Sequence, residues 1–105
     1  MSYKITFSTV AIKDIGKMTN DIYNACLDKK TTEEYVRRFL EKIYDKQCFP
    51  ESGTPLLFLG QATGYRYIIY KSYLAFYRIR GYEVIVDRIL FAKSDYFKDL
   101  IIEEN

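Results

Sequence analysis

The sequence contains no histidine, and this absence removes several kinds of chemistry at once. Nucleophile pairs in which a histidine activates a serine or a cysteine are excluded, and so is any metal site built on histidine ligands. The two cysteines, Cys26 and Cys48, do not have the spacing of metal ligands either. We therefore expect a protein that holds no metal and no cofactor.

Long apolar runs are also missing from the chain. No stretch approaches the length of a membrane span, and the N-terminus lacks the pattern of a signal peptide. In a reducing compartment, Cys26 and Cys48 are expected to be free and mostly buried thiols. These features predict a cytoplasmic protein.

Tyrosine is the residue in surplus, with 11 copies in 105 residues. A chain of this length is one domain, here residues 1–105, and its hydrophobic fraction of 49% is normal for a globular core. Tyrosine packs like a hydrophobic residue but keeps a hydroxyl for a partner, so the surplus suits an interface. The alternative is that these tyrosines simply fill a half-exposed sheet.

Three runs between residues 65 and 91 have the composition of β-strands. They are 65–70, 73–80 and 84–91, rich in β-branched and aromatic residues and separated by two or three residues. Such short links predict antiparallel neighbours, because a parallel crossover needs a dozen or more residues. The runs therefore predict a three-stranded meander, with Ile68 and Tyr70 on one face and Tyr65 and Tyr67 on the other.

The first half of the chain has one strand pattern followed by two helical patterns. Residues 3–7 alternate as a strand, and a helix capped by Ser8 or Thr9 follows, with an apolar stripe that consists of Ala11, Ile15, Met18, Ile22 and Ala25. A capping box at Thr31–Glu34 predicts the start of a second helix, whose apolar face is Val36, Phe39, Leu40 and Ile43. The pair Arg37-Arg38 is interpreted as part of its solvated face. The two helices are expected to form a hairpin that covers one side of the sheet.

The remaining segments complete an α+β fold. Residues 56–59 are either a strand or a loop pinned to the core, residues 60–64 are expected to be a turn, and residues 96–102 a short final helix. The predicted architecture is an N-terminal strand and a helical hairpin packed on an antiparallel sheet.

Positive charge is concentrated on the meander. Residues 65–93 hold six Lys and Arg against two acidic residues. Arg66, Arg78 and Lys93 are therefore candidates for binding an anion. The alternative for Arg66 and Arg78 is structural, either over tyrosine rings or paired with Asp87.

Taken in order, these segments resemble the RelE/ParE family of bacterial toxins from type II toxin–antitoxin modules. The resemblance covers nearly the whole chain and rests on the order and spacing of several short pieces. These are residues 3–8, Ala11, Asp14-Ile15, Phe49-Pro50, Gly53, Gly64-Tyr65-Arg66, Tyr73, Phe76-Tyr77-Arg78-Ile79, Ile89-Leu90 and residues 93–96 before Leu100.

The resemblance implies a growth-inhibiting toxin, of the kind that also stabilises plasmids, neutralised by a small antitoxin encoded beside it. RelE-like members cut mRNA on the ribosome with basic and proton-transfer residues on the sheet, whereas ParE-like members lack that cluster and poison DNA gyrase. Arg66 and Arg78 match basic positions of the family. Leu74 stands where the RNA-cutting relatives carry an arginine, and Ser94 is at or beside another such place, next to Lys93.

These matches favour a ParE-like toxin that acts by binding, with DNA gyrase as its target. RNA cleavage through the 2′-hydroxyl needs a base, a cation for the phosphorane charge and an acid, and the meander is short of proton-transfer groups. The alternatives are a ribosome-dependent mRNA endonuclease and an inactive member that only binds its antitoxin. The antitoxin is expected to fold onto the sheet, and its candidate contacts are Tyr67, Ile69, Tyr73 and Phe76.

Overall fold

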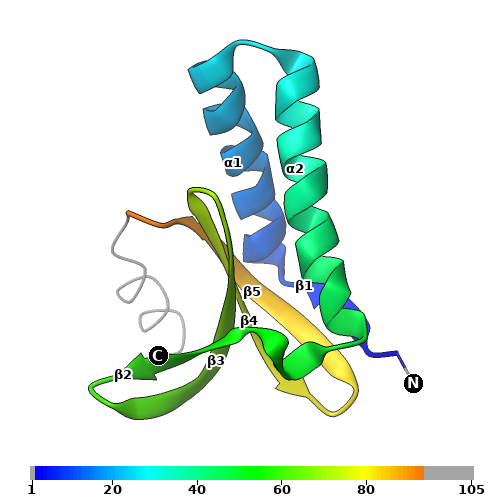
Figure 1. The fold of residues 1–105 in the computed structure, drawn as a ribbon, viewed down its shortest axis with the longest axis vertical. Coiled ribbons are helices and arrows are strands. Elements are labelled where there is room, and N and C mark those ends of the chain that lie inside the picture. Colours follow the sequence, from blue (N-terminus) through cyan, green and yellow to red (C-terminus); the bar gives the residue numbers. More distant parts are fainter. Residues whose placement is uncertain (1, 94–105) are drawn as a thin grey trace.

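The computed structural model describes residues 2–93, which form a mixed five-stranded sheet and a helical hairpin (Figure 1). The elements in chain order are β1 (Lys4–Phe7), α1 (Thr9–Cys26), α2 (Lys29–Tyr44), the 3-10 turns η1 (Asp45–Gln47) and η2 (Pro50–Ser52), β2 (Thr54–Phe58), β3 (Gln61–Tyr70), β4 (Tyr73–Arg80) and β5 (Glu83–Phe91). The predicted α+β architecture is confirmed. The helix expected at residues 96–102 lies outside the described residues.

The sheet has the strand order β1-β5-β4-β3-β2. The meander β3-β4-β5 is antiparallel, as the short links predict. β1 adds to it as a parallel edge strand beside the first half of β5, with Lys4 opposite Glu83 and Phe7 opposite Val86. This arrangement joins the two ends of the described chain, because the first strand pairs with the last one.

Helix α1 starts as the sequence predicts. The Oγ of Ser8 accepts a hydrogen bond from the backbone N–H of Ala11 at 2.9 Å, which is an N-cap, and its hydroxyl donates to the carbonyl oxygen of Asp87 at 2.8 Å. Ala11 and Met18 are buried, but Ala25, expected on the apolar stripe, is exposed. The reason is visible in Figure 1, where the joined ends of both helices project beyond the sheet.

Helix α2 begins two residues before the predicted capping box, at Lys29, with Asp28 as the N-cap residue. The hydroxyl of Thr31 donates to the Asp28 carboxylate, and the hydroxyl of Thr32 donates to the Asp28 carbonyl oxygen at 2.8 Å. The Thr31–Glu34 capping box is therefore wrong. The link from α1 is only Leu27-Asp28, and the carboxylate of Asp28 accepts from Thr31 and caps no backbone N–H.

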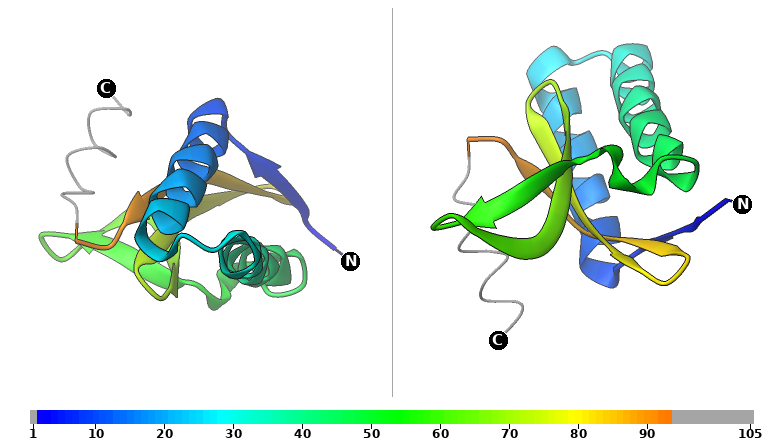
Figure 2. Two further views of the ribbon diagram at one scale, coloured as in Figure 1. Left: turned by 90° about the horizontal axis from the view of Figure 1, so that it is seen from above. Right: turned by 60° about the horizontal axis from the view of Figure 1, so that its bottom comes forward.

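The helical hairpin covers one face of the sheet, and the two turned views in Figure 2 show both helices on that side. The main core lies between these layers and is formed by Ala11, Met18, Phe39, Ile43, Ile68, Tyr73, Ala75, Tyr77, Val84, Val86 and Ile89. A second, smaller cluster lies on the other face and is formed by Leu56, Leu74, Phe76 and Leu90. Tyr65 and Tyr67 pack against this second cluster, and Tyr70 packs against the first, so the predicted alternation along β3 is confirmed.

The segment before the meander is a strand, β2, which settles the alternative left open for residues 56–59. The turn expected at residues 60–64 is wrong, because Phe58 pairs with Gln61 and the chain reverses in two residues, Leu59 and Gly60. Both have positive φ, 52° and 80°, the signs of the two-residue turn that matches the twist of a hairpin. β3 is therefore ten residues long and includes Gly64.

Cys26 and Cys48 are free thiols, as expected, but both are exposed, so their expected burial is wrong. Cys26 is the last residue of α1, in the part that projects beyond the sheet, and Cys48 follows η1 in the link to β2. Of the helices in residues 2–93, none combines the length and the apolarity that a membrane crossing requires.

Candidate functional site

Arg66 holds the link between η2 and β2. Its Nη1 donates to the carbonyl oxygens of Glu51 and Gly53, at 3.1 and 3.0 Å. Beside it, the buried hydroxyl of Tyr77 donates to the carbonyl of Pro50 at 2.7 Å and accepts from the N–H of Gly53 at 2.9 Å. Arg66 and Tyr77 are cross-strand partners, so together they fix the backbone of residues 50–53.

Burial raises the pKa of Tyr77, and the nearby charge of Glu51 adds to this shift, whereas the Gly53 N–H and the Arg66 guanidinium oppose it. The phenol therefore stays neutral at physiological pH. It acts as a fixed donor and acceptor in the core and not as a proton-transfer group at the surface.

Arg78 lies on the opposite face of the sheet from Arg66. Its Nε donates to Oδ2 of Asp87 at 2.7 Å, in a pair that is 43% exposed at the arginine and 16% at the aspartate. This is the structural alternative foreseen for Arg78, although the exposed fraction of the guanidinium also leaves room for a contact with a partner. A pair of this exposure contributes about 1 kcal/mol or less to folding.

Lys93 is exposed and follows the end of β5. Phe91 pairs with Tyr73 at the start of β4, whereas Arg78 is near the end of β4, roughly 16 Å further along the strand. Lys93 lies beyond Phe91, so it is still further from Arg78. The three candidate cations therefore do not converge. Two lie on opposite faces of the sheet and the third lies beyond the far end of the strands.

The two carboxylates of the meander are already engaged. Glu83 accepts a hydrogen bond from the hydroxyl of Thr6 at 2.7 Å, and Asp87 is held by Arg78. Leu74, at the place of the arginine in RNA-cutting relatives, is 4% exposed and belongs to the smaller core cluster. Within residues 2–93 the sheet thus offers charges for binding but no assembled set of acid, base and cation.

The four candidate antitoxin contacts are not on one surface. Phe76 is 0% exposed and packs beside Tyr67 on the face away from the helices. Ile69 presents 55% of its surface to solvent. Tyr73 lies on the helix side and lines a cavity of about 600 Å³ between α1, α2 and the β3-β4 turn. Only Ile69, Tyr67 and the cavity side of Tyr73 are within reach of a partner.

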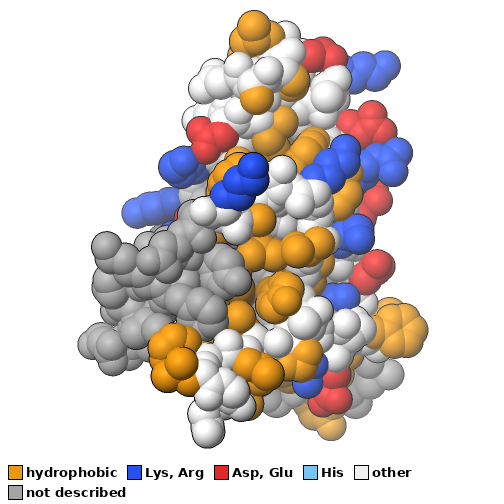
Figure 3. All heavy atoms as spheres, turned by 60° about the vertical axis from the view of Figure 1, so that its left-hand side comes forward, with side chains coloured by type: hydrophobic (Ala, Val, Ile, Leu, Met, Phe, Trp, Pro, Cys, Tyr) orange, Lys and Arg blue, Asp and Glu red, His pale blue; other side chains and the backbone are white. Residues whose placement is uncertain are grey.

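Exposed hydrophobic residues elsewhere give the fold more surface for a partner. Figure 3 shows hydrophobic side chains gathered over the middle and lower part of one face, with most charges along one side of it. In β2 and the turn after it, the exposed hydrophobic residues are Leu57, Phe58 and Leu59. The sequence analysis did not predict this exposed apolar edge. The signal it could have used is Leu59 directly before Gly60, an apolar residue at a position where the chain turns.

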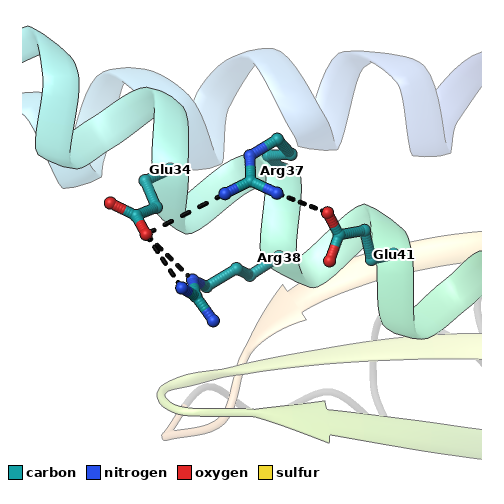
Figure 4. A network of polar contacts seen from close by, with 4 residues as sticks. All are labelled: Glu34, Arg37, Arg38 and Glu41. Carbon is teal, nitrogen blue, oxygen red and sulfur yellow. Dashed lines mark hydrogen bonds and ion pairs between the residues drawn. The ribbon is translucent and has the colours of Figure 1, made fainter.

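The solvated face of α2 is confirmed, and its charges neutralise one another. Glu34 accepts from Arg38 at 2.9 and 3.1 Å and lies 3.9 Å from Arg37, and Arg37 also pairs with Glu41 (Figure 4). The side-chain hydrogen bond with Glu34, and then its charge, raise the pKa of Arg38. The Arg37-Arg38 pair is therefore part of a surface network with its own carboxylates.

Comparison with known proteins places this fold in a class. The profile of the ParE toxin of type II toxin–antitoxin systems, parDE, matches residues 5–96. No curated protein sequence matches the chain. The chain is a toxin of a type II toxin–antitoxin system, and it belongs to the ParE toxin family within the wider ParE/RelE group.

Two solved structures show how widely this fold is shared. A chain of the chromosomal ParDE toxin–antitoxin system from P. aeruginosa is 18% identical, with a TM-score of 0.72 over 88% of this chain and 98% of that one. A chain of the RelBE2 toxin–antitoxin complex from Mycobacterium tuberculosis is 20% identical, with a TM-score of 0.61 over 89% and 95%. At these identities the similarity establishes the fold.

Proposed function

We propose that this toxin inhibits growth by binding DNA gyrase and that it cleaves no RNA itself. The observation that carries the proposal is the placement of the basic residues. Arg66 is bound to backbone carbonyls, Arg78 to Asp87, and the position of the missing arginine is filled by buried Leu74. A ribonuclease needs a cation and proton-transfer groups around one phosphate, and one lost donor costs on the order of 10²–10³ in rate.

The proposed partner in the resting state is a cognate antitoxin, in the cytoplasm. Both structural neighbours come from toxin–antitoxin systems, which supports such a partner. An antitoxin segment that folds on binding loses conformational entropy, and burial of apolar surface must offset this cost. The exposed apolar residues of β2, Ile69 and the cavity beside Tyr73 supply such surface.

The experiment is a supercoiling assay with purified gyrase and relaxed plasmid. Addition of the toxin is expected to abolish supercoiling and to leave linear plasmid after protein removal, and prior addition of antitoxin is expected to prevent both. Lys93→Gln should weaken the effect, because the side chain is exposed and its change removes only a charge. Lys29→Gln, on the exposed N-terminus of α2, is the matched control and should change nothing.

Two results would contradict the proposal. One is unchanged supercoiling at an excess of a toxin preparation that arrests cells, which would indicate the mRNA endonuclease alternative. The other is no growth arrest on induction without antitoxin, which would indicate an inactive member that only binds its antitoxin.

A further inference from the structure

Lys71 occupies a backbone position that a lysine rarely takes. Tyr70 pairs with Tyr73, so Lys71 and Ser72 form a two-residue turn, and Lys71 has φ of 52°. Glycine, asparagine and aspartate are the usual residues at positive φ in such turns. A residue held in a backbone conformation that its side chain disfavours often lies at a functional site.

The side chain of Lys71 lies on tyrosine rings. Its Nζ is 5.2 Å from the ring centre of Tyr35 and 5.5 Å from that of Tyr70, and the Nζ of Lys42 on α2 is 5.9 Å from Tyr70. The hydroxyl of Tyr35 also accepts from the N–H of Ser72 at 3.4 Å, which ties the turn to the helix. We call Tyr35, Lys42, Tyr70 and Lys71 the basic–aromatic patch.

The two lysines of the patch differ from the arginines next to them on α2. Arg37 and Arg38 have carboxylate partners on their own helix (Figure 4). In the part of the chain that the structure describes, neither Lys42 nor Lys71 forms an ion pair. The patch thus presents two positive charges, from separate elements, that converge on one ring.

The geometry favours a simple anion over a nucleic-acid base. Phe39 stacks on Tyr70 with ring centres 6.0 Å apart and planes 18° apart, and Tyr35 meets Tyr70 edge-on at 5.2 Å. The Tyr70 ring is therefore enclosed by its own neighbours, whereas single-stranded nucleic-acid sites offer aromatic faces for stacking. Two ammonium groups that remain without ion pairs suit carboxylates.

We infer that the basic–aromatic patch binds an acidic segment of the cognate antitoxin. This inference rests on the proposed toxin–antitoxin partnership and specifies its charge. Asp or Glu side chains of the antitoxin meet Lys42 and Lys71 beside the ring of Tyr70.

The test uses the toxin purified with the antitoxin encoded beside it. The affinity of the complex is measured by titration for the wild type and for Lys42→Gln combined with Lys71→Asn. Loss of two exposed charge contacts is expected to weaken the complex about tenfold at low salt, mostly through slower association. The difference should shrink in high salt, because exposed charges are screened.

The single variant Lys71→Asn separates a role in binding from a role in folding, because antitoxin affinity and thermal stability are expected to change in different directions. Asparagine accepts positive φ more readily than lysine, so the thermal midpoint of the isolated toxin should stay unchanged or rise while antitoxin affinity falls. The matched charge control is Lys29→Gln, on the same helix as Lys42, which should leave affinity unchanged.

Three outcomes would overturn the inference. Equal antitoxin affinity of the double variant and the wild type would show that the basic–aromatic patch does not bind the antitoxin, although the antitoxin itself remains a partner. If the wild-type toxin forms no complex with the antitoxin, both the proposed partnership and the inference about the patch are wrong. Binding of a single-stranded RNA 20-mer that the double variant loses, with unchanged antitoxin affinity, would reassign the patch to nucleic acid.

Discussion

Gly53→Ala is expected to destabilise the protein by about 3 kcal/mol, the cost of overpacking a core that cannot relax. A Cβ at Gly53 would lie 2.3 Å from Oη, 2.7 Å from Cε1 and 2.9 Å from Cζ of Tyr77. Tyr77 is fully buried and fixed by hydrogen bonds to Pro50 and Gly53, so its ring has no space to yield. The link that Arg66 also holds would have to move.

Urea denaturation followed by circular dichroism measures this effect. Gly16→Ala is the control, because Gly16 lies inside α1 with nothing within 4 Å of a new Cβ. That change is expected to stabilise the protein by about 0.5–1 kcal/mol through better helix propensity. A Gly53→Ala protein as stable as the wild type would show that the link is looser than described.

Asp14→Ala is expected to cost about 3 kcal/mol, because it breaks the ion pair that joins α1 to β5. Asp14 accepts from Nε and Nη2 of Arg88 at 2.8 and 3.2 Å, and from the backbone N–H of Ile89 at 2.9 Å. Both side chains of the pair are largely buried, at 11% and 14% exposed. β1 pairs only with the first half of β5 and, among residues 2–93, leaves the backbone of the second half without a strand partner on that edge. Asp14 provides a hydrogen-bond acceptor there for the N–H of Ile89.

The same denaturation measurement applies, with Asp21→Ala as the control. Asp21 is on the same helix and pairs with Lys17 at 2.8 Å, but that pair is 47% and 77% exposed. Its loss should cost about 0.5 kcal/mol or less. Equal effects of the two changes would mean that the Asp14–Arg88 pair is no stronger than a surface contact.

Strands and helices with clear periodicity could be predicted from the sequence. The meander, the stripe of α1 and the face of α2 follow from local patterns, since side-chain direction repeats every two or 3.6 residues. Two of the errors arose at boundaries. The start of α2 and the two-residue turn at Leu59-Gly60 each depended on a choice between neighbouring residues of similar propensity.

The candidate site could not be placed from the sequence, because its geometry depends on contacts distant in the chain. Arg66 and Arg78 matched basic positions, yet one guanidinium meets carbonyls of residues 51 and 53 and the other meets Asp87. Alternation along β3 and β4 puts them on opposite faces, which depends on the register between the strands. The basic–aromatic patch was missed because Lys42 and Lys71 belong to different elements.

Under the proposed function, this toxin arrests growth by binding and leaves mRNA intact. The most direct measurement is primer extension on messages from translating cells, a few minutes after the toxin is induced without its antitoxin. An unrelated, established mRNA-cleaving toxin serves as the positive control. We predict that messages keep their normal 5′ ends while growth stops. Cuts that follow the codon phase, and that disappear in Arg78→Ala while the variant remains folded, would contradict the claim and identify the toxin as an mRNA endonuclease.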